Sequence, residues 1–227
     1  LMDQVASLFG QANHLLAFDC ISNEIMPFEL PLNGAQLFLI DSKVKHNLAS
    51  SAYNERRASM EHAWELAQVL FPNLKNWRDL KPTELARLNS NLDATTQNRL
   101  RYVIEEIARV QAVQKLANEL VLLSPDQNPE ALLAQLGAYL NQTHEGLRDL
   151  YEVSCRELDF LQDEIRAQKG VYGARMMGGG FGGCLLVLAS REFGREDVQA
   201  LVSKFNAKHG LQSEWIDIRL SDGVYAV

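Results

Sequence analysis

Five glycines occur within six consecutive positions, 178–183, near the end of this 227-residue chain. Apolar runs at 173–177 and 185–188 flank the cluster and are typical of strands. Glycine loses more backbone freedom on folding than any other residue, so the cluster is unfavourable unless the chain turns sharply or another group approaches closely. The sequence alone leaves two interpretations open, a bulged turn between strands or a loop beside a ligand.

The middle of the chain is helical and its two ends supply strands, which indicates the α+β class. A stretch at 31–34, Pro-Leu-Asn-Gly, predicts a turn, and the apolar residues 38–40 predict a strand covered on both faces. Ser50 and Ser51 are candidate N-caps of a helix that begins near 52, and Ser154 of one that begins at 155. Hydrophobic periodicity predicts helices over 3–10, 52–70, 82–88, 93–122, 129–141, 155–168 and 196–209, and strands over 14–21, 36–41, 215–220 and 224–227.

Composition excludes several classes of function. A net charge of −7, from 22 basic and 29 acidic residues, gives no electrostatic reason to bind nucleic acid. No apolar run approaches the roughly 18 residues that a membrane-spanning helix needs. The three cysteines, Cys20, Cys155 and Cys184, are far apart, form no paired metal motif and fit a reducing compartment. We therefore expect a cytoplasmic protein without a membrane or nucleic-acid partner.

Read with its flanks, the glycine cluster resembles the third motif of the GHMP small-molecule kinases in its galactokinase form. The matching stretch at 173–184 is Gly-Ala-Arg-Met-Met-Gly-Gly-Gly-Phe-Gly-Gly-Cys. In that family the loop lies beside the phosphate site and helps to shape the sugar pocket. Met177 stands where the family usually has Thr, which leaves the backbone role of the loop and puts that hydroxyl's contribution in question. The resemblance implies a phosphate-side loop of Gly178, Gly179, Gly180, Gly182 and Gly183, with Gly179 also contacting substrate.

The opening residues, Leu-Met-Asp-Gln, are similar to the end of the galactokinase segment Gly-Ile-Met-Asp-Gln, whose Asp is the catalytic residue. The resemblance gives this role to Asp3, whose carboxylate would orient the sugar C1 hydroxyl and accept its proton. Without the resemblance, an Asp at a helix start is typical of a cap or of a partner of the helix dipole. The chain opens directly in helix-like sequence without Met at position 1, so we expect a preceding segment of the protein to be absent.

The stretch 43–57 resembles the part of galactokinases in which a strand ends and a Tyr-Asn-x-Arg-Arg helix begins. The family's Tyr contacts bound galactose, so the resemblance gives that role to Tyr53. A Tyr offers an apolar face for a pyranose ring and a hydroxyl for its oxygens. Without the resemblance, Tyr53 reads equally as a half-buried core residue, and Arg56 and Arg57 as a solvated helix face.

Two further stretches are similar to galactokinases. Residues 140–184 include Leu-Arg-Asp-Leu-Tyr-Glu-Val-Ser-Cys at 147–155 and are expected to form the helix beneath the loop. Residues 101–114 resemble the long central helix of the family, for which we expect a structural role. Cys155 is expected to be a small, buried core residue, since no sequence feature indicates a partner that would activate a catalytic thiol.

The resemblance extends over essentially the whole chain and implies its organisation. Residues 1–47 would be a remnant of an N-terminal α/β kinase domain, with the catalytic Asp helix and strands. Residues 48–227 would be a GHMP-kinase C-terminal domain, an antiparallel sheet with packed helices. The parent enzyme would transfer the γ-phosphoryl group of ATP to the anomeric hydroxyl of galactose, with Mg²⁺ as a cofactor.

The family's Gly-Ser-Ser-rich loop, which wraps the ATP phosphates, has no counterpart in this sequence. Since electrostatic stabilisation of the transferring group is the larger catalytic term, we expect the chain alone to be inactive, with no metal ligand and no bound cofactor. Its expected partners are a small-molecule sugar and the absent N-terminal segment of the same protein. Two alternatives remain open: a kinase for N-acetylgalactosamine or another sugar, and a galactokinase-like sugar sensor without catalysis.

Overall fold

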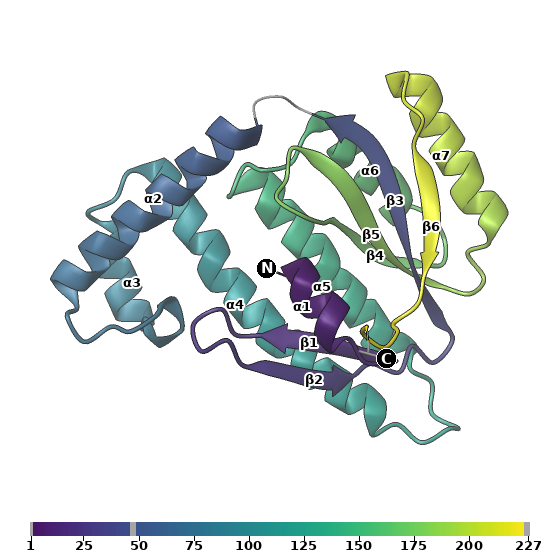
Figure 1. The fold of residues 1–227 in the computed structure, drawn as a ribbon, viewed down its shortest axis with the longest axis horizontal. Helices are drawn as coiled ribbons and strands as arrows, with labels where there is room; N and C mark the ends of the chain where they lie inside the picture. The colour runs from purple at the N-terminus through teal and green to yellow at the C-terminus, as the bar shows by residue number, and fades with distance from the viewer. Residues whose placement is uncertain (1, 46–48, 225–227) are drawn as a thin grey trace.

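The computed structural model describes residues 2–45 and 49–224 as an α+β fold (Figure 1). Among these residues, no helix is long and apolar enough to span a membrane. The helices are α1 (Met2–Phe9), α2 (Ala49–Leu70), the short 3₁₀ helix η1 (Trp77–Asp79), α3 (Pro82–Asn89), α4 (Ala94–Val121), α5 (Glu130–Asp149), α6 (Arg156–Arg166) and α7 (Arg195–His209). The strands are β1 (His14–Phe18), β2 (Ile25–Glu29), β3 (Ala35–Lys45), β4 (Val171–Met176), β5 (Gly182–Ser190) and β6 (Glu214–Ile218).

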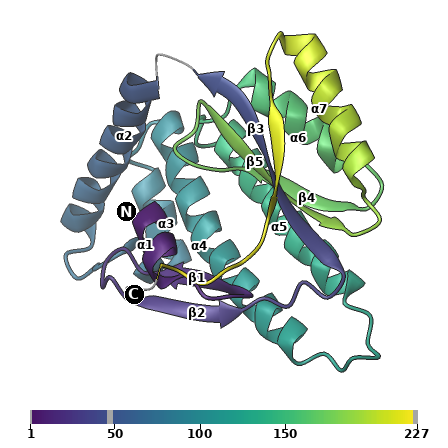
Figure 2. The same ribbon diagram turned by 45° about the vertical axis from the view of Figure 1, so that its right-hand side comes forward.

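Two antiparallel sheets organise the chain. The larger has four strands in the order β4-β5-β3-β6, so β3 lies in its interior although it precedes the helical middle of the sequence. The smaller is the hairpin of β1 and β2, in which Leu16 faces Pro27. Figures 1 and 2 show α2 and α3 at the opposite end of the molecule from α7. The expected class, an antiparallel sheet with packed helices, is confirmed.

Helices cover the four-stranded sheet on both faces. Phe38 and Ile40 of β3 are buried against residues of α6 and α7, such as Leu161 and Phe205. Leu37, the residue before Phe38, points to the other face and packs in a cluster with Leu116 of α4 and residues of α5. Alternate side chains of a strand point to opposite faces, so both sets of apolar residues have a core. The prediction of a doubly covered strand at 38–40 is confirmed.

The strand β2 was not predicted, because its sequence Ile-Met-Pro-Phe-Glu contains a proline that argues against a central strand. Pro27 is tolerated in this two-stranded hairpin. β1 ends at Phe18 rather than at 21, because the carboxylate of Asp19 accepts hydrogen bonds from the backbone of Ile21 (2.8 Å) and Ser22 (3.3 Å) and so closes a turn. The predicted turn at 31–34 is present and connects β2 to β3.

Helix α5 ends at Asp149, eight residues beyond the predicted end at 141. The added turns are polar in sequence, yet Thr143 and His144 are buried because their side chains find polar partners inside the fold. The last sheet strand ends at Ile218 rather than 220. The predicted strand 224–227 is wrong at Val224, and its remaining residues lie outside the described part of the chain. The proposed domain boundary at 47/48 also lies outside it.

Candidate functional site

The glycine cluster forms the turn between β4 and β5. Gly178, Gly180, Gly182 and Gly183 all have φ between +89° and +138°, which is the region that side chains disfavour. Two of them also sit where no side chain fits. A Cβ on Gly180 would lie 2.4 Å from the carbonyl oxygen of Val153, and one on Gly182 2.3 Å from that of Val44. The turn therefore needs glycine both for its conformation and for close packing.

Other segments hold the middle of this turn in place. Phe181, which itself has φ of +60°, donates its backbone N–H to the Val153 carbonyl at 2.7 Å. The Val153 N–H donates in turn to Leu147 O at 2.9 Å, at the end of α5. Gly178 and Gly179 differ from the other two glycines, because no atom lies within 4 Å of the place where a Cβ would stand. One side of the turn is thus packed and the other is open.

The open side of the turn faces a cavity of about 450 Å³. Tyr53, on the first turns of α2, is 55% exposed and lines this cavity together with Gly178 and Gly179. The alternative that Tyr53 is a core residue is thereby ruled out. The remaining lining comes from the same face of α2, from the end of α5 and from the segment after it: Arg56, Arg57, Met60, Glu61, Trp64, Leu147, Tyr151 and Val153. Burial raises the pKa of the Tyr151 phenol, so this side chain stays neutral.

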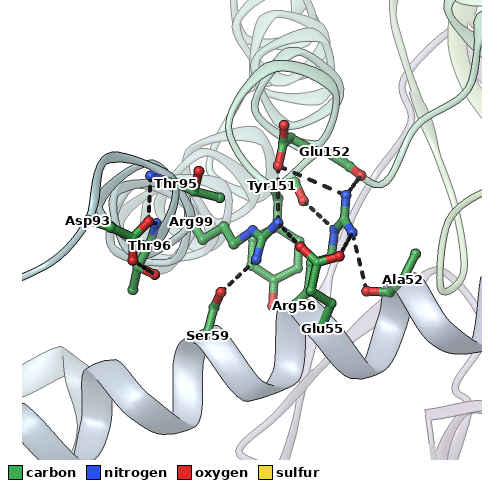
Figure 3. A network of polar contacts seen from close by, with 10 residues as sticks. All are labelled: Ala52, Glu55, Arg56, Ser59, Asp93, Thr95, Thr96, Arg99, Tyr151 and Glu152. Atoms are coloured by element: carbon green, nitrogen blue, oxygen red, sulfur yellow. Dashed lines mark hydrogen bonds and ion pairs between the residues drawn. The ribbon is translucent and has the colours of Figure 1, made fainter.

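Arg56 joins the helix that carries Tyr53 to the glycine turn. Its guanidinium donates to the carbonyl oxygen of Glu152 at 2.8 Å and to that of Tyr151 at 3.4 Å (Figure 3). The same group lies over the ring of Phe181, 5.6 Å from its centroid, in cation–π geometry. The alternative reading of Arg56 as part of a solvated helix face is therefore wrong, because its side chain is 13% exposed.

A second arginine supports this arrangement from α4. Arg99 is 3% exposed and donates to Glu55 of α2 at 2.8 Å, to Ser59 at 2.5 Å and to the carboxylate of Glu152 at 3.1 Å (Figure 3). Burial alone would lower the pKa of Arg99, and the hydrogen bonds with the two carboxylates outweigh it. Glu152 has φ of +55°, which lets its carbonyl face Arg56 while its carboxylate faces Arg99. This cluster, Arg56, Arg99, Glu55, Ser59 and Glu152, is called the arginine network below.

Asp3 lies on the first turn of α1, is exposed and is not among the residues that line the cavity. In both views α1 lies between α2 and β6 (Figures 1 and 2). The structure therefore brings Tyr53, Gly178 and Gly179 together in one cavity, with Gly180 and Gly182 packed behind them, and leaves the role of Asp3 a prediction. Met177 is 41% exposed and does not line the cavity either.

The described residues offer no metal site and no activated thiol. No three His, Cys, Asp or Glu side chains in that part of the chain lie close enough to hold an ion. Burial raises the pKa of Cys155 to about 11 and also raises that of Cys184, so neither thiol ionises readily. The predicted N-cap at Ser154 is wrong: its hydroxyl donates to the carboxylate of Asp159 at 2.5 Å, and Cys155 caps α6 without a side-chain bond.

The arginine network and the buried His144 were missed by the sequence reasoning. Arg99 stands beside Leu100 within an amphipathic helix, so its pattern is that of any surface arginine at the edge of an apolar stripe. Its partner Glu152 is 53 residues away, and only the fold brings the two together. For His144 the one available signal was the polar run at the end of α5. If the helix continues through that run, some of its polar side chains must face the core.

Comparison with known proteins supports the whole-chain resemblance. Residues 130–208, from α5 to α7, match the family model "GHMP kinases C terminal". The galactokinase of Thermotoga petrophila is 37% identical over 227 residues, which is 100% of this chain and 59% of that protein. The chain therefore spans less than two thirds of the length of the curated relatives it matches.

Solved structures agree. A crystal structure of Lactococcus lactis galactokinase complexed with galactose superposes with a TM-score of 0.84 at 27% identity, covering 98% of this chain and 54% of that one. L. major mevalonate kinase in complex with R-mevalonate shares the fold with a TM-score of 0.50 at 14% identity, covering 93% and 50%. Residues 130–208 thus match the C-terminal domain of GHMP kinases, and the chain as a whole is similar in sequence and in fold to the C-terminal part of galactokinases.

Proposed function

We propose that the chain is the C-terminal part of a galactokinase, an enzyme that transfers the γ-phosphoryl group of ATP to the anomeric hydroxyl of galactose. The observation that carries the proposal is the cavity in which Tyr53 faces Gly178 and Gly179. An aromatic side chain and open backbone in one concave surface suit a small polar ring such as a pyranose. Relatives named galactokinase, similar over the whole chain, and a neighbour complexed with galactose support the same assignment.

In this proposal, Tyr53 contacts the sugar and Gly179 lets it approach the backbone closely. Gly178, Gly180, Gly182 and Gly183 shape the loop on the phosphate side. Residues 1–47 belong to the N-terminal kinase domain and 48–227 to the C-terminal domain, although β3 contributes one of the two interior strands of a sheet whose other strands lie in the second part. The protein acts in the cytoplasm, on a small-molecule substrate.

Asp3 is the proposed catalytic residue. Its carboxylate would orient the attacking C1 hydroxyl and accept its proton, while transfer depends on positioning and on charge stabilisation of the phosphoryl group. Mg²⁺ would neutralise charge on the ATP phosphates. No three His, Cys, Asp or Glu side chains of the described residues lie close enough to hold this ion. We infer that its ligands and the phosphate cradle come from a part of the protein outside this chain, and that the chain alone transfers nothing measurable.

The substrate is tested in the complete protein by measuring ADP release and sugar phosphate with galactose and with N-acetylgalactosamine. We expect preference for galactose. A preference for N-acetylgalactosamine would replace the proposal by the related kinase. Binding of galactose and ATP without any sugar phosphate would replace it by a sensor.

Tyr53 is tested by Tyr53→Ala, which removes the aromatic wall of the cavity. The KM for galactose is expected to rise roughly tenfold, as for loss of about 1.4 kcal/mol of binding, with unfolding of the protein unchanged because the side chain is more than half exposed. Val69→Ala serves as a control from the same helix, because this residue is 76% exposed and does not line the cavity. An unchanged KM for Tyr53→Ala contradicts the assignment of the cavity as the sugar site.

Asp3 is tested by Asp3→Ala in the complete protein. Since the carboxylate acts on the transition state, kcat is expected to fall by at least roughly 100-fold while galactose binding is largely kept. Asp3→Asn separates charge from shape and is expected to lose nearly as much. Turnover at the wild-type rate in Asp3→Ala would remove Asp3 from the mechanism.

A further inference from the structure

Strand β4 is an edge of the four-stranded sheet, and helix α5 covers that edge. The two approach so closely that a Cβ on Gly137 would lie 2.3 Å from the Tyr172 carbonyl, and one on Gly173 2.0 Å from Gly137 O. Asn141, one turn further along α5, accepts the backbone N–H of Ala174 at 3.0 Å. Side chains of the helix thus replace the missing neighbour strand, since a buried backbone N–H needs an acceptor.

His144 makes the corresponding bond at the last residue of β4. Its Nδ1 accepts the N–H of Met176 at 3.1 Å, and the imidazole is fully buried. Because Nδ1 accepts, a neutral ring must carry its proton on Nε2. Nε2 faces Oδ1 of Asp159 on α6 at 3.4 Å and makes no hydrogen bond in the structure. The proton on Nε2 therefore lies beside a carboxylate oxygen without a hydrogen bond to it.

The chain of polar groups continues to the far side of the glycine turn. The same Oδ1 of Asp159 accepts the hydroxyl of Ser154 at 2.5 Å. Ser154 follows Val153, whose carbonyl holds the N–H of Phe181 in the middle of the turn. His144 and Asp159 thus connect the residue that enters the turn to the segment that anchors its centre.

We propose that His144 is a positioning residue for the glycine turn, holding Met176 through Nδ1 and, through Asp159, the segment that anchors Phe181. This inference rests on the proposed function of the turn as the wall of the sugar and phosphate site. The imidazole touches neither cavity nor substrate and acts through the backbone it holds. A shift of about 1 Å in such a wall is enough to lose roughly 100-fold in rate.

The chain supplies a matched control for a merely structural role. Asn141 also lies on α5 and also accepts an N–H of β4, but its contact is two residues further from the turn and has no connection to Asp159. If the histidine only caps a sheet edge, His144→Leu and Asn141→Leu should behave alike. His144→Asn provides the rescue, because its amide oxygen can take the place of Nδ1.

The first measurement is amide hydrogen exchange by NMR on the complete protein, which needs no activity. His144→Leu is expected to speed exchange at Met176 and also at Phe181, whereas Asn141→Leu should speed exchange at Ala174 and leave Phe181 protected. His144→Asn should restore protection at Met176. Unchanged exchange at Phe181 in His144→Leu would overturn the connection between the two anchors.

The second measurement is galactose phosphorylation by the complete protein, corrected for the folded fraction. We expect kcat/KM to fall roughly 10- to 100-fold in His144→Leu, to stay within about threefold of wild type in Asn141→Leu, and to recover in His144→Asn. Equal losses in the two leucine variants would overturn the positioning role. An inactive wild-type protein would refute the proposed function instead, and the exchange measurement would then decide the inference by itself.

Discussion

The two sides of the glycine turn differ at the level of single residues. Gly180 has φ of +94°, and its missing side chain makes room for the Val153 carbonyl. Gly179 has ordinary φ and faces open space. Gly180, which is packed and has a left-handed backbone, is therefore adjacent to Gly179, which faces open space, and the sequence does not distinguish the two.

Alanine at these two positions should differ in its effect on stability. Gly180→Ala is expected to lower the free energy of unfolding by about 1–3 kcal/mol, because it adds backbone strain and a clash with a carbonyl oxygen. Gly179→Ala should change it by less than about 0.5 kcal/mol. Urea unfolding of the chain, followed by circular dichroism, measures both. Equal stability of the two variants would contradict the packed and open sides assigned here.

Sequence reasoning reached the site residues unevenly. The cluster at 178–183 was recognisable, because five glycines in six residues have few structural uses. Tyr53 was recognisable only through a resemblance, since one tyrosine at a helix start has no distinctive pattern. For Arg56 the residue pattern offered only a solvated helix face, and nothing in its neighbourhood along the chain could reveal that its partners come from 151–152. Contacts between distant residues are a property of the fold.

At the scale of elements, the arginine network ties α2 and α4 to the segment after α5 (Figure 3). Its central cation, Arg99, is buried, whereas the side chains of Glu55 and Glu152 are 63% and 52% exposed. Removing the arginine leaves two carboxylates that water can hydrate. The network thus acts chiefly to set the position of α2, and with it Tyr53, relative to the glycine turn.

This network predicts a change in acid sensitivity. The hydrogen bond from Arg99 holds the pKa of Glu55 below its ordinary value of 4.5. A carboxylate with a lowered folded-state pKa stabilises the fold above its unfolded pKa, and that contribution is lost as the pH falls through the folded value. Arg99→Met should therefore be less stable than wild type at pH 7, and the difference should shrink below about pH 4.5.

Urea midpoints of wild type and Arg99→Met between about pH 7 and pH 3 provide the measurement. Asp93→Ala is the control. Asp93 caps α4 through Thr95 and Thr96, and its pKa is also lowered, chiefly by the Thr96 side chain, but it lies outside the network. In Asp93→Ala, the part of the pH dependence of stability that comes from Glu55 should be the same as in wild type. A difference between wild type and Arg99→Met that is constant with pH would show that Arg99 stabilises by packing alone.

The elements themselves were largely predictable where one physical rule dominates. α4 has a helical stripe and an Asp93 cap at its start, and its observed bounds differ from the prediction by one residue at each end. The strand β2 was not predicted, because proline is rare in strands except at sheet edges. The local sequence does not reveal that Pro27 lies in a two-stranded hairpin, where it is tolerated. α5 was predicted too short because its last turns are polar, and they are buried only through partners on β4 and α4.

At the scale of the whole molecule, the C-terminal segment fastens the N-terminal helix (Figures 1 and 2). The N–H of Gly223 donates to Gly10 O at 2.8 Å, and that of Val224 donates to Ser7 O at 2.7 Å. Asp222 accepts the N–H of Ala12 at 2.9 Å. Val5 is the one buried residue of the described helix α1, so these bonds do more than its packing to fix where Asp3 stands.

These bonds between the C-terminal segment and α1 predict that Gly223, which lies 220 positions after Asp3 in the sequence, affects the chemistry proposed for Asp3. A Cβ on Gly223 would lie 2.8 Å from the carbonyl carbon and oxygen of Leu8, so Gly223→Ala must push α1 away. In the complete protein kcat is expected to fall roughly 10- to 100-fold, since the carboxylate would lose its place, whereas the KM for galactose should stay close to wild type because the Tyr53 cavity is untouched. Gly194→Ala is the matched glycine control, because its Cβ would meet its nearest neighbour at an ordinary 3.6 Å. Equal kcat values in the two variants would mean that the catalytic carboxylate is not carried by α1. A rise in the KM for galactose without a change in kcat would mean that the contact between the C-terminal segment and α1 supports the sugar site instead.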